Sequence, residues 1–131
     1  MHKRICKRNV VGLLLCGLLL TAVGCGSKIE TVDENSARTT LTKALDAWKA
    51  GTPQSALSQQ DPPISVGEIF WESGRKLASY KVNGSGTADT RGNLRVPVTL
   101  ELQAPKGTEK IEATYVVTVS PKMTVVREFQ D

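Results

Sequence analysis

Residues 94–103 read Leu-Arg-Val-Pro-Val-Thr-Leu-Glu-Leu-Gln and alternate between apolar and polar side chains. A period of two places the apolar side chains on one face of a β-strand and the polar ones on the other. The segment therefore predicts a strand with one face in a core and the other in water. Pro97 cannot donate to a β-ladder, so we expect a bulge there or a missing N–H that points away from the neighbouring strand.

The same alternation appears on both sides of this segment. Residues 76–82 alternate before it, and residues 111–119 and 123–129 form further β-branched, alternating runs after it. The glycines within 84–93 and the Pro-Lys-Gly at 105–107 are typical of tight connections. Short connections favour antiparallel neighbours, so the pattern predicts a four-stranded antiparallel meander.

A different period precedes the strands. Apolar residues recur at helical spacing on one face, at Ala37, Leu41, Ala44, Leu45 and Trp48. Asp33 is placed to cap the N-terminus, and Gly51 followed by Pro53 supplies the stop. We expect an amphipathic helix over 34–50 that packs across the apolar face of the sheet, which is an α+β fold.

The segment between this helix and the first alternating strand has no clear period. Residues 53–63 are rich in proline, glutamine and serine and indicate a loop with a helical turn at 55–59. Apolar residues return over 64–71, where we expect a brief strand and then a helical turn that ends near Gly74.

The first 24 residues have the composition of an export signal. Four basic residues stand before an apolar run of 14 residues, Val10–Val23. A helix needs about 20 residues to cross a bilayer core, so a cleaved signal fits better than a permanent span.

Ala22-Val23-Gly24-Cys25 resembles the lipobox of bacterial lipoproteins. The resemblance implies that Cys25 carries lipid and becomes the first residue of the mature chain, with 25–32 as a lipidated tether and 33–131 as a single domain. Two or more acyl chains give stable membrane attachment. We therefore expect an exported protein anchored to the cell envelope. Gly26 favours the outer membrane or periplasmic face in a diderm host.

Composition narrows the chemistry of the predicted mature chain. The signal holds four of the 17 basic residues and no acidic one, so 13 basic and 13 acidic residues remain. This balance argues against a nucleic-acid partner. The only histidine, His2, lies in the signal, and Cys25 is the only cysteine outside it. The sequence thus predicts no Ser-His-Asp or Cys-His catalysis, no metal site and no cofactor.

Aromatic side chains are the candidate lining of an apolar ligand pocket. They also fit a role as plain core residues, because they occupy inward-facing positions. The aromatic residues are Trp48, Trp71, Tyr80 and Tyr115.

One helix followed by a meander resembles the cystatin-like and NTF2-like architecture, over residues 33–129. The segments 44–51, 61–64 and 120–127 also resemble small lipoproteins of planctomycete bacteria, a family without an assigned activity. The resemblance supports the domain and adds no chemistry. The lack of histidine, thiol and metal clusters predicts a non-enzymatic binding or structural module of the envelope, which contacts an envelope protein or a small ligand.

The alternative is a small NTF2-like enzyme that uses carboxylate and tyrosine groups for acid–base chemistry in a helix–sheet cleft. Its candidate carboxylates are Asp46, Glu72, Asp89 and Glu101.

Overall fold

The computed structural model describes residues 32–129. The chain begins with helix α1 (Glu34–Lys49), the 3₁₀ helix η1 (Gln54–Gln59), strand β1 (Ile64–Gly67) and the short helix α2 (Ile69–Glu72). Five strands follow: β2 (Leu77–Val82), β3 (Thr87–Ala88), β4 (Leu94–Ala104), β5 (Gly107–Thr118) and β6 (Met123–Glu128).

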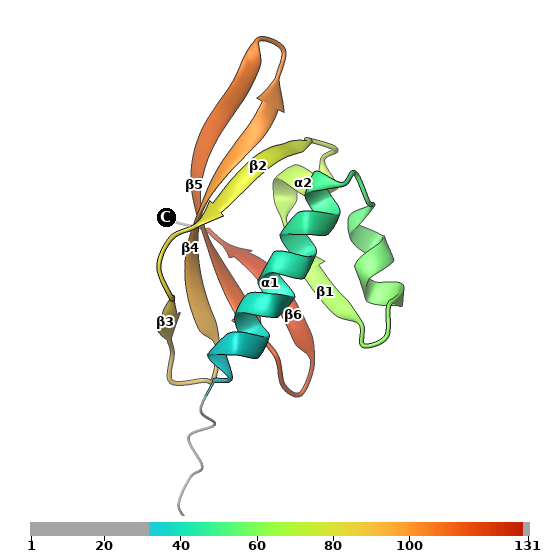
Figure 1. The fold of residues 1–131 in the computed structure, drawn as a ribbon. Coiled ribbons are helices and arrows are strands. Elements are labelled where there is room, and N and C mark those ends of the chain that lie inside the picture. The colour runs from blue at the N-terminus through green and yellow to red at the C-terminus, as the bar shows by residue number, and fades with distance from the viewer. Residues whose placement is uncertain (1–31, 130–131) are drawn as a thin grey trace, which may run out of the picture.

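Helix α1 begins and ends where its sequence signals indicate. The Asp33 carboxylate accepts a hydrogen bond of 3.1 Å from the Ser36 backbone N–H, which satisfies one of the free donors of the first turn. Ala50 caps the C-terminus, and Gly51 then adopts a φ of 81°, a conformation that favours glycine. The helix lies diagonally across one face of the sheet (Figure 1).

The fold is α+β, with a mixed sheet of six strands in the order β1-β6-β5-β4-β2 and β3 beside β4. The prediction of a four-stranded antiparallel meander is wrong. Strand β1 pairs in parallel with β6, and the two-residue β3 adds a second short partner to β4. The brief strand and the helical turn expected over 64–71 are confirmed as β1 and α2. The pairing of β1 was not predicted, because its partner lies about 60 positions away and a four-residue strand has no period that identifies its neighbour.

Pro97 lies in an uninterrupted stretch of the β4–β5 ladder, opposite Thr114. Its carbonyl accepts a hydrogen bond of 2.9 Å from the Asn83 N–H. Carbonyl and nitrogen of a strand residue point to the same side, so the nitrogen without a proton lies on the β2 side, away from β5. The sheet does have a bulge, but between Leu77 and Ser79 of β2.

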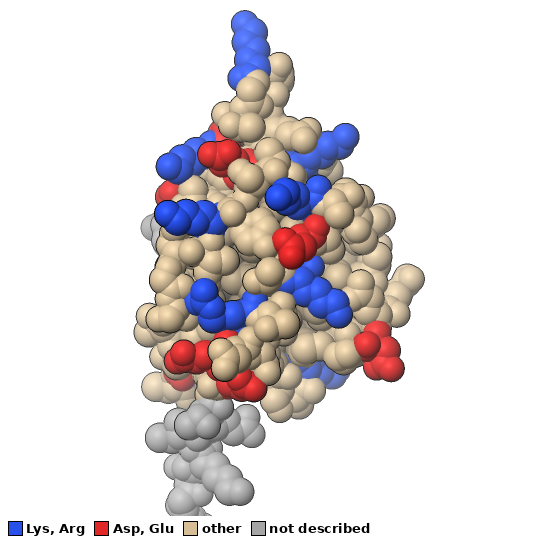
Figure 2. All heavy atoms as spheres, in the orientation of Figure 1, with Lys and Arg blue, Asp and Glu red and all other residues tan. Residues whose placement is uncertain are grey.

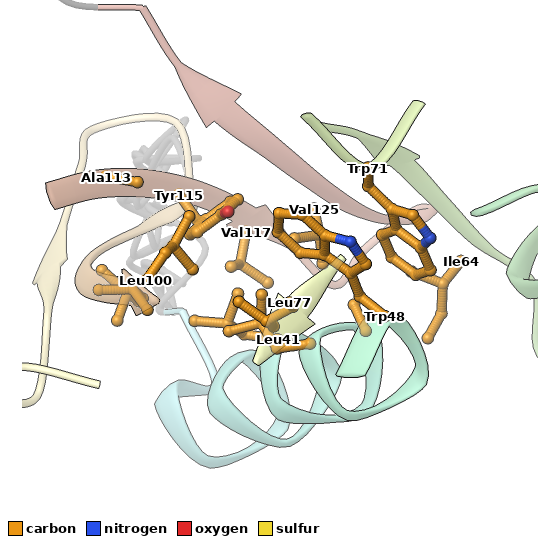
Figure 3. Packing of buried hydrophobic residues seen from close by; sticks show 14 of the residues in the cluster. Leu41, Trp48, Ile64, Trp71, Leu77, Leu100, Ala113, Tyr115, Val117 and Val125 are labelled. Carbon is orange, nitrogen blue, oxygen red and sulfur yellow. The ribbon is translucent and has the colours of Figure 1, made fainter. Parts of the chain in front are cut away.

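The space between α1 and the sheet is filled by apolar side chains (Figure 3). The helix contributes its predicted stripe, and β4 contributes five fully buried residues. Trp48 is 2% exposed, stacks on Trp71 with ring centroids 5.7 Å apart, and donates from Nε1 to the Arg75 carbonyl at 2.8 Å. Trp48 therefore anchors the end of α1 through both packing and a hydrogen bond.

We expect Trp48→Ala to lower the free energy of unfolding by about 3–5 kcal/mol, because it removes a buried aromatic side chain and leaves a cavity. Lys49→Ala alters the neighbouring exposed position and should change it by less than about 0.5 kcal/mol. Urea midpoints of the two variants test the difference. A near-native midpoint for Trp48→Ala would contradict the anchoring role.

Candidate functional site

A buried carboxylate stands where β1 meets α2. Glu68 is 1% exposed and occupies the N-cap position of α2, where its Oε1 accepts a hydrogen bond of 2.9 Å from the Phe70 N–H. A four-residue helix is not stable by itself, so this cap and the packing around it hold α2 in place.

The register of the sheet determines the partners of Glu68. Gly67 pairs with Val126 in the parallel ladder. The residues that follow them, Glu68 and Arg127, therefore lie beside each other. Arg127 in turn lies directly opposite Tyr115 in the β5–β6 ladder. Residues opposite each other in a ladder share a face, which places both side chains next to the carboxylate.

All three contacts of Glu68 are made to groups that stabilise a negative charge. Arg127 Nη1 lies 3.3 Å from Oε1, and the Tyr115 hydroxyl donates to Oε2. Removal of one partner from such a buried pair typically costs about 3–5 kcal/mol, because the other charge stays buried without compensation. The cluster of Glu68, Tyr115 and Arg127 thus fixes the end of the sheet to α2.

Two guanidinium groups lie over the ring of Phe70, the second residue of α2. The Cζ atoms of Arg127 and Arg75 are 4.4 and 5.0 Å from the ring centroid. Arg75 is also paired with Glu109 of β5 at 2.5 Å. The ring therefore packs against cations that already have carboxylate partners.

A cavity of about 360 Å³, which we name the α2–β6 pocket, opens beside this cluster. The cavity volume is within the range of small-ligand sites. The pocket is lined by Ile69, Phe70, Glu112, Ala113, Thr114, Arg127, Glu128 and Phe129.

The lining includes two of the large apolar side chains that the domain leaves in water. Ile69 is 49% exposed and Phe129 is 71% exposed. Of the charged groups, Arg127 is paired with Glu68, and Glu128 is paired with Arg95. The pocket thus offers an apolar surface next to charges that are mostly satisfied within the protein.

The four predicted pocket aromatics are distributed over separate environments. Trp48 and Trp71 come together and line a smaller hollow of about 200 Å³ at the end of α1. The Tyr115 hydroxyl bonds to Glu68 inside the domain, whereas the Tyr80 hydroxyl donates at 2.6 Å to Asp46 on an exposed part of α1. The structure does not combine the four into one ligand pocket.

The carboxylates predicted for acid–base chemistry are also spread over the domain. Asp46 bonds to Tyr80, Asp89 accepts bonds from the backbone N–H groups of Arg91 and Asn93, and Glu101 accepts one from Ser79. Glu72 lies on the exposed side of α2. Asp89 therefore stabilises a turn, whereas Asp46 and Glu101 pair with side chains of β2.

Sequence reasoning missed Glu68, Phe70, Arg75 and Arg127. The available signal was Glu68 itself, a single charge in the apolar run from Ile64 to Trp71. The side chains that contact Glu68 could not be predicted, because the contacts depend on the β1–β6 register. Cys25, the predicted lipidation site, lies outside the described residues.

Comparison with family models, with curated proteins and with solved structures finds no match. Within residues 32–129, no helix is long and apolar enough to span a membrane, and no group of three or more metal-ligating side chains is assembled.

Both tyrosines are expected to titrate abnormally. Burial, and then the neighbouring Glu68 carboxylate, hold the pKa of Tyr115 far above its ordinary value of 10.0. Partial burial and the bond to Asp46 raise the pKa of Tyr80 to about 12. Both shifts favour the protonated form in the folded state, so their contribution to stability is complete below pH 10 and is lost as the pH rises above it.

We therefore expect little phenolate absorbance from the folded protein near pH 10, and half-ionisation of both tyrosines there in denaturant. In Tyr115→Phe the remaining tyrosine should titrate near pH 12, whereas in Tyr80→Phe the remaining one should ionise only as the protein unfolds. Ultraviolet titration of the three proteins measures this. An ordinary titration of Tyr115 in the folded state would contradict its burial against Glu68.

Proposed function

We propose that this protein is a lipid-anchored module of the bacterial envelope that binds an apolar group of a protein or small ligand in the α2–β6 pocket and does not transform it. The observation that carries the binding role is the exposure of Ile69 and Phe129 around a cavity of about 360 Å³. Exposed apolar side chains that gather at a hollow are typical of contact sites.

The state of the polar groups supports binding over catalysis. A general acid or base must reach the substrate, whereas Tyr115 and Glu68 are each 1% exposed and bonded to each other. The helix–sheet space, where the enzyme alternative places its cleft, is occupied by the core. An α-helix across a curved sheet also supports a cystatin-like or NTF2-like architecture, which serves many functions and does not select one.

The surface charge of the domain agrees with a neutral or apolar ligand. Acidic and basic side chains are interspersed over the face shown in Figure 2, without a broad area of one sign. Such a mixture gives little electrostatic attraction for a polyanion. The proposed contact with the membrane is accordingly made by lipid on Cys25.

The anchor is tested by metabolic labelling of the exported protein with a fatty acid. Wild type should incorporate the label and fractionate with membranes, because thioether-linked acyl chains hold it there. Cys25→Ser should lose both properties, and Cys16→Ser, which alters a cysteine inside the predicted signal, should retain them. Equal labelling of Cys25→Ser and wild type would refute lipidation at this residue.

The pocket is tested with N-acetylphenylalaninamide, a neutral probe that carries one aromatic ring. We expect saturable amide chemical-shift changes at Ala113 and Thr114, and binding about tenfold weaker in Phe129→Ala, equivalent to about 1.4 kcal/mol. Val126→Ala is the matched control, because Val126 is 43% exposed on β6, three residues before Phe129, and does not line the pocket. Equal binding by wild type and Phe129→Ala would argue against this site.

A further inference from the structure

Strand β5 is longer than the strand beside it. It spans 12 residues, but β6 pairs only with Thr114–Thr118. The first part of β5, from Gly107 to Ala113, is paired with β4 on one side only. Among the described residues this leaves an open sheet edge, which belongs to the hairpin that projects from the domain in Figure 1.

The direction of the backbone groups at this edge follows from two hydrogen bonds on the opposite side of β4. The Asn83 N–H donates to the Pro97 carbonyl and the Gln103 N–H donates to the Lys76 carbonyl, both at 2.9 Å. The backbone N–H and C=O positions of residues 97 and 103 therefore point toward β2. The backbone N–H and C=O groups of their partners across the ladder, Thr114 and Thr108, must then point away from β4. By alternation, Lys110 and Glu112 do the same. Thr108, Lys110 and Glu112 together present six backbone groups that have no strand partner among residues 32–129.

The side chains along the open edge divide by face. Lys110 and Glu112 are exposed and stand on the face of the sheet opposite α1, with opposite charges two residues apart. Ile111 and Ala113 point to the other face, where Ala113 lines the α2–β6 pocket. A strand laid along this edge would therefore meet Lys110 and Glu112 on one face and Glu109, Ile111 and Ala113 on the other, and its end near Glu112 and Ala113 would border the α2–β6 pocket.

We propose that the open edge of β5 binds an extended segment of another protein as an added antiparallel strand. This inference rests on the proposed binding function and specifies the ligand. Backbone hydrogen bonds to Lys110 and Glu112 supply affinity, and alternate side chains supply selectivity. The segment has a basic residue opposite Glu112, an apolar residue opposite Ile111 that faces the pocket side, and an acidic residue opposite Lys110.

A second copy of this chain fits the edge less well. Antiparallel self-pairing about Ile111 sets Lys110 opposite Glu112, but it carries the partner's hairpin past Thr114, where β6 already lies. Self-pairing about Lys110 or Glu109 places like charges directly opposite each other, which is unfavourable. A free segment that ends before β6 avoids both conflicts.

The test uses the peptide acetyl-Lys-Val-Glu-Thr-amide, whose first residue lies two positions beyond the Thr114–Glu128 pair, and the full chain in detergent micelles. Because the added strand is antiparallel, this order sets lysine opposite Glu112 and glutamate opposite Lys110. We expect chemical-shift changes at residues 108–112 and binding at least about fivefold weaker for the peptide with lysine and glutamate exchanged. Equal binding of the two peptides, or no shifts at this edge, would overturn the proposal.

The backbone contribution is tested with Lys110→Pro. The Lys110 N–H points to the open edge, so proline removes a donor for the added strand and leaves the β4–β5 ladder intact. Lys110→Pro should abolish peptide binding, whereas Lys110→Ala should retain it with a few-fold loss. Unchanged binding by Lys110→Pro would refute strand addition. N-acetylphenylalaninamide should still bind to Lys110→Pro, so failure of the edge is distinguishable from failure of the pocket.

Two further measurements keep the test decisive. If Lys110→Pro does not fold, peptides with N-methylated backbone replace it: methylation at glutamate, whose N–H faces β5, should abolish binding, and methylation at valine, whose N–H faces away, should not. Equal effects would refute the proposed pairing.

Sedimentation of the wild type should show a monomer. A dimer that Lys110→Pro dissociates would assign the edge to a second copy and overturn the proposal.

Discussion

The contacts of the Glu68 carboxylate join the start of α2 to strands β5 and β6, whose contacting residues lie 47 and 59 positions later in the sequence. Its partners are the N–H of Phe70 in α2, the hydroxyl of Tyr115 in β5 and the guanidinium of Arg127 in β6. A carboxylate that is 1% exposed is tolerated only with such partners, because burial of an unpaired charge costs several kcal/mol or more. The parallel β1–β6 ladder, the placement of α2 and the wall of the α2–β6 pocket all depend on this arrangement. A shift of β1 by one residue would turn Glu68 to the opposite face and separate it from Arg127.

This arrangement also determines what chemistry the domain has available. The polar groups best placed for proton transfer are already bonded to one another, and the rings and aliphatic side chains beside them stay accessible. Phe70 illustrates the division, since its ring contacts two guanidinium groups that have carboxylate partners and also lines the pocket. A surface of this kind can gain free energy from the burial of an apolar group without the cost of separating an ion pair.

The sequence predicted those parts of the fold whose signals are local. Helix α1 follows from one apolar stripe, the Asp33 cap and the Gly51 stop, and strand β4 from its alternation. The parallel partner of β6 was not predictable in this way, because pairing over about 60 residues leaves no mark in the period of a four-residue strand. Most of the candidate site was not predicted for the same reason, because its contacts depend on the β1–β6 pairing. Trp48 and Tyr115 were recognised as inward-facing, but the meeting of Tyr115 with Glu68 depends on register, which composition and spacing do not encode.

The edges of the sheet differ in how they are closed, and the difference bears on the role of β5. Beside β1, the Gln54 side chain donates at 2.9 Å to the Val66 carbonyl, so η1 takes the place of a neighbouring strand. Strand β2 is interrupted by a bulge and carries the exposed Lys81, both of which discourage strand pairing. Residues 107–113 of β5 are regular, and on the face opposite α1 they carry one charge of each sign, Lys110 and Glu112, while Glu109 on the other face is paired with Arg75. An apolar strand that covers a charged edge removes the charges from water at a cost in free energy, which protects a protein from aggregation. Since a pair of opposite charges is neutral as a whole, it deters an uncharged or like-charged strand but accepts one in which the two signs are reversed.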